Sequence, residues 1–241
     1  MSEAVEWRGA GEPYSPRFAD IYRSAGAAAL PQAQQVFLAG CGLPQAWAGQ
    51  ARCRILETGF GLGLNFLATW AAWQADARPC TELHFLSVEA YPVAADDLLR
   101  SAQALQATGA GDTTLLPQVQ ALARELAAAW SGVQAGVQTL HFAQGRVRLT
   151  LAVGEVQTML AQLDGPVDAV FLDGFSPARN PAMWSQPTLQ EVARLCRPGT
   201  RLASWTVAGE VRTRLRSLGF EVHKRAGLPP KRQRLEAVYA I

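Results

Sequence analysis

The sequence predicts an α/β domain with a mostly parallel β-sheet covered by helices on both faces. Short β-branched or aliphatic runs alternate with helical stretches of about 10–15 residues, a succession typical of parallel sheets. The chain has 241 residues, of which 49% are hydrophobic, so we expect one domain with a substantial core. We divide it into an N-terminal elaboration, residues 1–50, and a main domain, residues 51–241.

About seven strands are expected in this doubly wound sheet, the last of them antiparallel. They are placed at residues 54–58, 83–89, 147–153, 167–173, 201–206, 221–225 and 234–240. Helices are expected at residues 65–74, 93–106, 117–130, 155–162, 188–195 and 209–218. A Gly-Leu-Pro-Pro turn at residues 227–230 predicts that the final two strands form an antiparallel hairpin at the end of the sheet. Residues 1–50, rich in Gly, Pro and Ala, predict short helices that cover the active-site region.

Composition argues against several classes of protein. The 4 cysteines and 3 histidines have no metal-ligand spacing, so neither a metal site nor a disulfide scaffold is expected. The N-terminus lacks the basic-then-apolar pattern of a signal peptide. A charge-free window at residues 58–75 contains glycines, Asn65 and Gln74, which indicates a buried segment rather than a membrane span. We therefore expect a cytoplasmic protein and, by default, a monomer.

Charge is distributed unevenly along the chain. The net charge is +2, but residues 194–241 hold 11 Lys or Arg and 3 Asp or Glu. Such asymmetry favours an anionic partner, for example a nucleic acid, near the C-terminal portion. The alternative is a solvated basic face without a partner.

A glycine-rich loop at residues 59–63 lies between the first predicted strand of the main domain and the helix after it. Glycines there permit positive φ angles and a close approach of a ligand to the backbone, although a purely structural turn is the alternative. The spacing does not match the G-x-G-x-x-G dinucleotide fingerprint, which argues against an NAD-dependent dehydrogenase. The observed E-x-G-x-G-x-G resembles the first motif of class I S-adenosylmethionine-dependent methyltransferases. This resemblance implies a cofactor, S-adenosylmethionine, and a binding loop made of Glu57, Gly59, Phe60, Gly61, Gly63 and Asn65.

Two further acids are candidate cofactor ligands. Glu89 ends the second strand, where an ionised carboxylate can accept hydrogen bonds from ribose hydroxyls, although acids at strand ends are often only solvated. Glu155 follows the third strand. Methyltransferases often carry an acid there that binds the adenine amino group, but Glu155 could equally be a first-turn acid favoured by the helix dipole.

Asp173 is the candidate catalytic residue. An apolar strand delivers it into a loop stiffened by glycine and proline, where doubly wound enzymes place their active site. Amino-group methyltransferases commonly carry D/N-P-P-Y/F here and use it to orient the nucleophilic nitrogen. This chain has D-G-F-S-P, a departure that indicates a subfamily. We expect Asp173 to contact the cofactor and to accept an N–H of the substrate amine. Phe175 is expected either to stack on a target base or to be a core aromatic.

Five motifs together resemble the methyltransferase domain of the bacterial tRNA 5-methylaminomethyl-2-thiouridine biosynthesis enzymes, known as the N-terminal half of MnmC or as stand-alone MnmD. They are YSPRFADIY at 14–22, LETGFGLGLNF at 56–66, VEAYP at 88–92, FLDGFSPARNPAMW at 171–184 and PPKRQRLE at 229–236. The resemblance implies methyl transfer to the primary amine of 5-aminomethyl-2-thiouridine at the wobble position, in the tRNA anticodon loop. It also implies an FAD-dependent oxidase, fused or separate, that supplies this substrate.

The residues expected to contact the substrate come from the same motifs and from the basic segment. They are Tyr14, Arg17, Phe175, Ser176, Arg179, Lys231 and Arg232, with Arg212, Arg214, Arg216 and Arg234 as further phosphate candidates. Two other classes of function use the same loop. A small-molecule amine N-methyltransferase would leave the basic segment unexplained, and a nucleotide-binding module would bind cofactor without transferring a methyl group.

Overall fold

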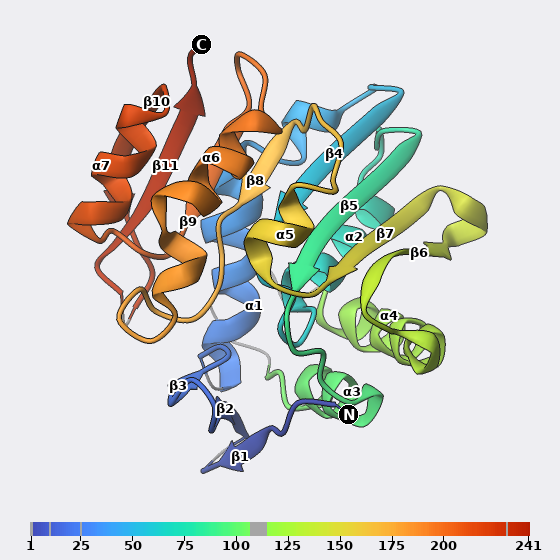
Figure 1. The fold of residues 1–241 in the computed structure, drawn as a ribbon. Coiled ribbons are helices and arrows are strands. Elements are labelled where there is room, and N and C mark those ends of the chain that lie inside the picture. Colours follow the sequence, from blue (N-terminus) through green and yellow to red (C-terminus); the bar gives the residue numbers. More distant parts are fainter. Residues whose placement is uncertain (1, 10, 25, 107–114, 230) are drawn as a thin grey trace.

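The computed structural model describes residues 2–9, 11–24, 26–106, 115–229 and 231–241 (Figure 1). Within them, the central sheet has 8 strands in the order β10-β11-β9-β8-β4-β5-β7-β6. The strands are β4 (Arg52–Glu57), β5 (Glu82–Glu89), β6 (Gly136–Phe142), β7 (Val147–Val153), β8 (Ala169–Phe171), β9 (Arg201–Ser204), β10 (Phe220–Ala226) and β11 (Gln233–Tyr239). The predicted α/β class is confirmed.

Each of the predicted strands is present, although β8 is shorter than expected. Strands β7, β5, β4, β8 and β9 run parallel, and β11 is antiparallel to both β9 and β10. The C-terminal hairpin is therefore confirmed, although the last residue of its predicted turn, Pro230, lies outside the described residues. About seven strands were expected, and the eighth is β6, which was not placed from the sequence and pairs antiparallel with β7 at the edge of the sheet. Edge strands half-exposed to solvent carry a weak apolar signal, which explains the omission.

The predicted helices are also present, with ends shifted by a few residues. They are α2 (Leu64–Ala75), α3 (Ala95–Gln103), α4 (Leu116–Ala129), α5 (Val156–Leu160), α6 (Gln186–Arg194) and α7 (Gly209–Ser217). Three short helical turns lie between these elements: η5 (Trp130–Gly132) after α4, η6 (Ala143–Gly145) between β6 and β7, and η7 (Pro181–Trp184) before α6. In the described part of the chain, we find no helix with the length and apolar character needed to cross a bilayer.

Two hydrophobic cores lie on opposite faces of the sheet. Successive side chains of a strand point to opposite faces, so Ile55 packs with α2 and α4 whereas Leu56 packs with α5, α6 and α7. In Figure 1, α5 and α6 lie in front of the sheet while α1 and α2 lie behind it. The charge-free window is buried as predicted, since Phe66 and Trp70 of α2 are 0% exposed.

The N-terminal elaboration differs from the expected cover of short helices. Residues 26–47 do form short helical segments: η1 (Gly26–Ala28), α1 (Ala29–Gln32), η2 (Ala33–Leu38), η3 (Ala39–Cys41) and η4 (Gln45–Trp47). Before them, however, β1 (Glu6–Arg8), β2 (Glu12–Ser15) and β3 (Asp20–Ile21) form a small antiparallel sheet. Strands this short leave no periodic pattern. Contacts from other elements support them, such as the hydrogen bond from Trp7 Nε1 to Asp97 Oδ1 of α3 (2.9 Å).

Candidate active site

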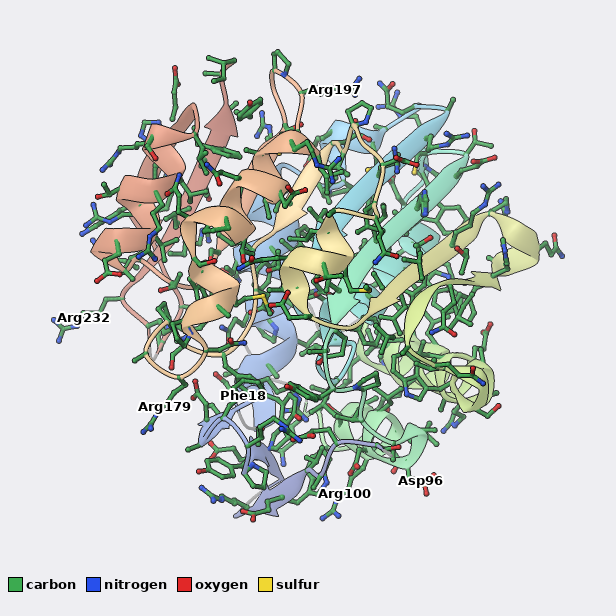
Figure 2. All side chains as sticks on the ribbon, viewed as in Figure 1. Phe18, Asp96, Arg100, Arg179, Arg197 and Arg232 are labelled. Carbon is green, nitrogen blue, oxygen red and sulfur yellow. The ribbon has the colours of Figure 1, made fainter. Side chains whose placement is uncertain are left out.

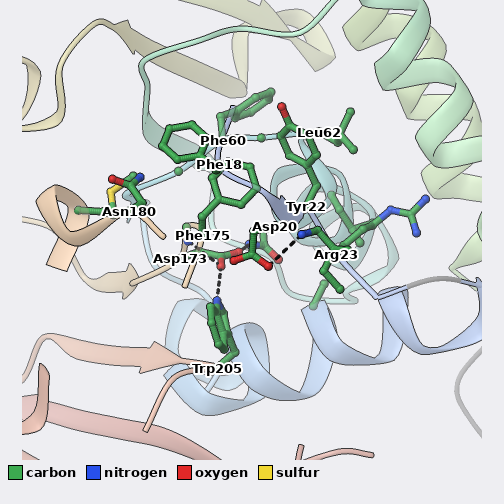
Figure 3. A pocket seen from close by; sticks show the side chains of 18 of the residues that line it. Phe18, Asp20, Tyr22, Arg23, Phe60, Leu62, Asp173, Phe175, Asn180 and Trp205 are labelled. Carbon is green, nitrogen blue, oxygen red and sulfur yellow. Dashed lines mark hydrogen bonds between the residues drawn. The ribbon is translucent and has the colours of Figure 1, made fainter. Parts of the chain in front are cut away.

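A cavity of about 220 Å³ lies at the carboxyl ends of β4, β5 and β8 (Figure 3). The loop after β4, the ends of β5 and β8, and the segment after β2 form its walls. Many of the residues predicted from the sequence line it: Gly59, Phe60, Gly61, Asn65, Glu89, Asp173, Phe175 and Lys231. The fold therefore brings the glycine loop, the strand-end acid and the candidate catalytic acid to one cavity.

The glycine loop adopts the positive φ angles expected from the sequence, and one of its glycines lies close to another backbone segment. Gly61 has φ +52° and Gly63 has φ +72°, in the left-handed region that favours glycine. At Gly59, a Cβ would lie 3.3 Å from the carbonyl oxygen of Asp173, so the loop is pressed against the end of β8. Gly63 does not line the cavity; a Cβ there would meet the Phe60 ring at 3.0 Å.

Glu89 is held against the glycine loop by backbone donors. Its Oε2 accepts the Gly61 N–H (2.8 Å) and its Oε1 accepts the Tyr91 N–H (2.8 Å). Burial raises the pKa of Glu89, and these two hydrogen bonds oppose the rise. Each carboxylate oxygen has a second lone pair, so the oriented group can still accept two hydroxyl donors. This geometry fits a ribose ligand.

Asp173 is fixed by three donors. Its Oδ1 accepts the Trp205 Nε1–H (2.9 Å) and the Gly174 N–H (2.8 Å), and its Oδ2 accepts from Asn65 Nδ2 (2.8 Å). Figure 3 shows the indole of Trp205 directed at this carboxylate. Burial raises the pKa of Asp173, while the hydrogen bonds lower it. A carboxylate has about four acceptor positions, so about one remains for a further N–H donor.

Glu57 lies behind the cavity wall and connects to Asp173 through Asn65. The Asn65 amide donates to Glu57 Oε1 (2.9 Å) as well as to Asp173 Oδ2, and Glu57 Oε2 accepts from Ser87 Oγ (2.7 Å). Glu57 is 1% exposed and does not line the cavity, so its contact with the cofactor stays a prediction. Its observed role is to orient Asn65.

The remaining predicted residues lie outside the cavity. Glu155 caps α5 by accepting the N–H groups of Gln157 (2.9 Å) and Thr158 (3.3 Å), so the structure shows the helix-terminus interpretation, and its adenine contact stays a prediction. The ring of Tyr14 lies under Arg8, and Arg17 lies over the ring of Tyr91.

Arg179 and Arg232 are exposed and extend outward on the same side of the molecule (Figure 2). Ser176 also lies outside the cavity, and its backbone N–H donates to Asp20 Oδ2 of β3 (2.9 Å). These three residues stand at or beyond the rim of the site, where a large substrate rather than a buried ligand could reach them.

Comparison with known proteins identifies the family. A model described as S-adenosyl-L-methionine-dependent methyltransferase matches residues 117–240. The chain belongs to this family. The bifunctional protein MnmC for tRNA 5-methylaminomethyl-2-thiouridine biosynthesis from Paracidovorax citrulli (strain AAC00-1) is 54% identical over 239 residues, which are 99% of this chain and 36% of that protein. MnmC of Acidovorax sp. (strain JS42) is 54% identical over 240 residues, 100% of this chain and 36% of that protein. The chain thus spans about a third of the length of these relatives.

A solved structure supports the fold of this methyltransferase. MNMC2 from Aquifex aeolicus superposes with a TM-score of 0.72 at 20% sequence identity, covering 100% of this chain and 72% of the other. The two chains therefore share their fold. The S-adenosylmethionine-dependent class predicted from the glycine loop is confirmed.

The residues at the cavity fit S-adenosylmethionine. A Cβ on Gly61 would project toward the Tyr22 ring, 3.4 Å away, so the glycine leaves free a space next to Glu89 that a side chain would fill. We expect the Gly59–Gly63 loop to hold the methionine part and Glu89 the ribose. When bound, the cofactor supplies an electrophilic methyl group on a sulfonium.

The sequence missed four residues of this site. Phe18 stacks on Phe175 with ring centroids 4.6 Å apart, and Tyr22 packs edge-on against the same ring at 5.0 Å. Asp20 and Trp205 also line the cavity. The first three belong to the Y-S-P-R-F-A-D-I-Y motif, so the signal was present, whereas Trp205 follows β9 without any motif.

Because the Glu57 carboxyl is buried, we expect the stability of the protein to depend on pH. Burial raises the pKa of Glu57 well above its ordinary value, so the folded state binds this proton more tightly than the unfolded state. Stability linked to Glu57 is then fully present below the ordinary carboxyl pKa and is lost as pH rises toward the folded value, by about 1.4 kcal/mol per pH unit. Glu57→Gln keeps an acceptor for Asn65 and removes this loss.

Urea unfolding at pH 5 and pH 8 tests this prediction. The free energy of unfolding of Glu57→Gln should fall less between the two pH values than that of the unmodified protein. Glu125→Gln, on the exposed face of α4, is the matched control and should behave as the unmodified protein does. Equal losses in the Glu57→Gln variant and the unmodified protein would show that the buried carboxyl carries no such linkage.

Proposed function

We propose that this chain transfers a methyl group from S-adenosylmethionine to the primary amine of 5-aminomethyl-2-thiouridine at the wobble position of tRNA. The names of its 54% identical relatives support a role in that modification. The observation that carries the proposal is the position of Asp173, on the same cavity as the glycine loop and Glu89, with an acceptor position left for an amine.

Asp173 has two effects on the amine in this proposal. An alkylamine is mostly protonated at neutral pH and reacts only through its lone pair. Asp173 accepts one N–H and aims that lone pair, and it stabilises the positive charge that develops on nitrogen as the new bond forms. A nearby carboxylate also stabilises the ammonium form of the substrate before the reaction, and burial of the amine counters this by disfavouring the charged form. Positioning of this kind can supply roughly 7–11 kcal/mol of the barrier.

The aromatic residues offer a surface for the target base. Phe175 and Phe18 are already in contact, with their rings at 24° to each other. A base that stacks on the face of Phe175 next to Phe18 displaces Phe18 from it. Stacking on one ring contributes roughly 1–3 kcal/mol, enough to favour a base taken out of the anticodon loop.

The exposed arginines predict a salt-dependent affinity for RNA. Arg179 and Arg232 lie on one side of the molecule and are our phosphate contacts. Each contact to single-stranded RNA adds a slope of about −0.7 to the plot of log affinity against log salt. Arg232→Met should therefore weaken binding and flatten that slope by about 0.7. Arg78→Met, exposed at the amino end of β5, is the control and should leave the slope unchanged. A salt-independent affinity would remove the phosphate contacts from the proposal.

A separate reaction has to supply the aminomethyl group. We propose an FAD-dependent oxidase for that step, fused to this domain or separate from it, in keeping with the word bifunctional in the relatives' names. The proposal also keeps the cytoplasmic location and the monomeric state expected from the sequence.

Comparison of two substrates tests the choice of tRNA over a small amine. We expect kcat/KM for an anticodon stem-loop carrying 5-aminomethyl-2-thiouridine to exceed that for the free nucleoside by about 100-fold, since only the RNA reaches the phosphate contacts. Equal values would favour a small-molecule amine N-methyltransferase. Cofactor binding without methylation of either substrate would indicate a binding module.

A further inference from the structure

Lys231 lies inside the active site, although its sequence context is that of a basic surface. It is half-buried, lines the cavity, and places Nζ 3.2 Å from the centroid of the Trp205 ring. The Nε1–H of that indole donates to Asp173 Oδ1 (2.9 Å). One tryptophan thus contacts both groups, with the lysine on its face and the aspartate at its edge. The next residue, Arg232, is exposed.

The ammonium of Lys231 is attracted by nearby charges but not held in an ion pair. The negative charges of Asp173 and Asp20 act on it and raise its pKa. On the hairpin, Arg234 lies near Lys231 but is paired with Glu236 (2.7 Å). Among the residues that the structure describes, no carboxylate lies within 4.0 Å of Lys231 Nζ. The amine therefore remains available to a ligand in the cavity.

Burial makes the neutral form of this lysine accessible. It lowers the pKa of Lys231 to about 8, against the opposite effect of Asp173 and Asp20. At pH 7.5, roughly a quarter of such groups are neutral. An amine whose pKa lies near the working pH is suited to accept a proton as a general base. Once Lys231 has accepted the proton, the face of the Trp205 ring and the carboxylates of Asp173 and Asp20 stabilise its ammonium.

We propose that Lys231 is the proton acceptor for the substrate amine, a role that rests on the proposed function. The substrate ammonium gives one proton to the neutral Nζ of Lys231 and becomes an amine held by Asp173. The nitrogen lone pair then forms the bond to the methyl carbon as the carbon–sulfur bond breaks, and its electron pair leaves on sulfur. Lys231 afterwards releases its proton to solvent.

Two substitutions separate this role from a phosphate contact. Lys231→Arg keeps the positive charge, but a guanidinium stays protonated and cannot accept the proton. Lys231→Met removes charge and base together. In single-turnover methyl transfer to the modified stem-loop, with RNA and cofactor saturating, both variants should be slower at pH 7.5 by about 100-fold or more. In the unmodified protein, the rate should rise with pH around the pKa of Lys231. In both variants, the midpoint of this rise should shift to a different pH.

The control is Arg232→Met, which should bind RNA more weakly and keep the pH dependence of the unmodified protein. Thermal unfolding and cofactor affinity of each variant report folding separately. A Lys231→Arg variant with the rate and pH profile of the unmodified protein would overturn the inference and leave the proposed function standing. An unmodified protein that binds cofactor but methylates no RNA would instead overturn the proposed function.

Discussion

Replacing Asp173 with asparagine is expected to lower the single-turnover rate of methyl transfer by about 10²–10³-fold. Both oxygens of the carboxylate accept hydrogen bonds, from Trp205, Gly174 and Asn65. An asparagine amide has only one acceptor oxygen, so its NH₂ group would have to point at one of these donors. The variant also loses the negative charge that faces the developing cation. Removing one preorganised electrostatic group of this kind costs roughly 2.7–4 kcal/mol of transition-state stabilisation.

Rapid-quench measurement of labelled methyl transfer, at saturating cofactor and RNA, gives this rate. Asp168→Asn is the matched control. Asp168 precedes β8, at the amino end of the strand and away from the cavity, and accepts the Arg54 N–H (2.8 Å). That variant should retain its rate even where its stability is lower. Near-normal turnover in a folded Asp173→Asn variant would contradict the role assigned to this carboxylate.

Replacing Glu89 with alanine is expected to weaken S-adenosylmethionine binding by about 100-fold or more. Hydrogen bonds to a charged group contribute roughly 1.5–3 kcal/mol each, and the ribose offers two hydroxyls. The substitution also leaves the N–H groups of Gly61 and Tyr91 without their acceptor, which loosens the glycine loop. Glu89→Gln keeps one carbonyl acceptor and should have an intermediate affinity.

Isothermal titration of the cofactor into each variant measures these affinities. Glu82→Ala provides the control on the same strand, since Glu82 lies at the amino end of β5 and pairs with Arg52 (3.2 Å). Its cofactor affinity should match that of the unmodified protein. An affinity for Glu89→Ala within threefold of the unmodified value would remove Glu89 from the cofactor site.

The part of the fold that could be predicted is the part whose signals are local. Apolar runs ending in Glu57, Glu89 and Asp173 predict buried parallel strands, and the carboxyl ends of such strands meet at one edge. The glycines at 59–63 predict a turn with positive φ angles, as Gly61 and Gly63 have. Sequence reasoning therefore brought the glycine loop and two acids to one site.

The remainder depends on tertiary contacts that leave no local pattern. Lys231 belongs to a basic run typical of a surface, but the C-terminal hairpin turns it inward onto Trp205. Strand β6 and the N-terminal sheet are short or half-exposed, and pairing partners decide their structure. The Glu155 carboxylate caps α5, as one of the two interpretations of this acid expected, and its contact with adenine stays a prediction.

Methyl transfer to tRNA tests the central proposal most directly. Transfer RNA that carries 5-aminomethyl-2-thiouridine at the wobble position is incubated with the protein and methyl-labelled S-adenosylmethionine, then digested to nucleosides and separated. The proposal predicts label in 5-methylaminomethyl-2-thiouridine, and in no other nucleoside. Cofactor binding with no labelled nucleoside, or label on a different base, would contradict it.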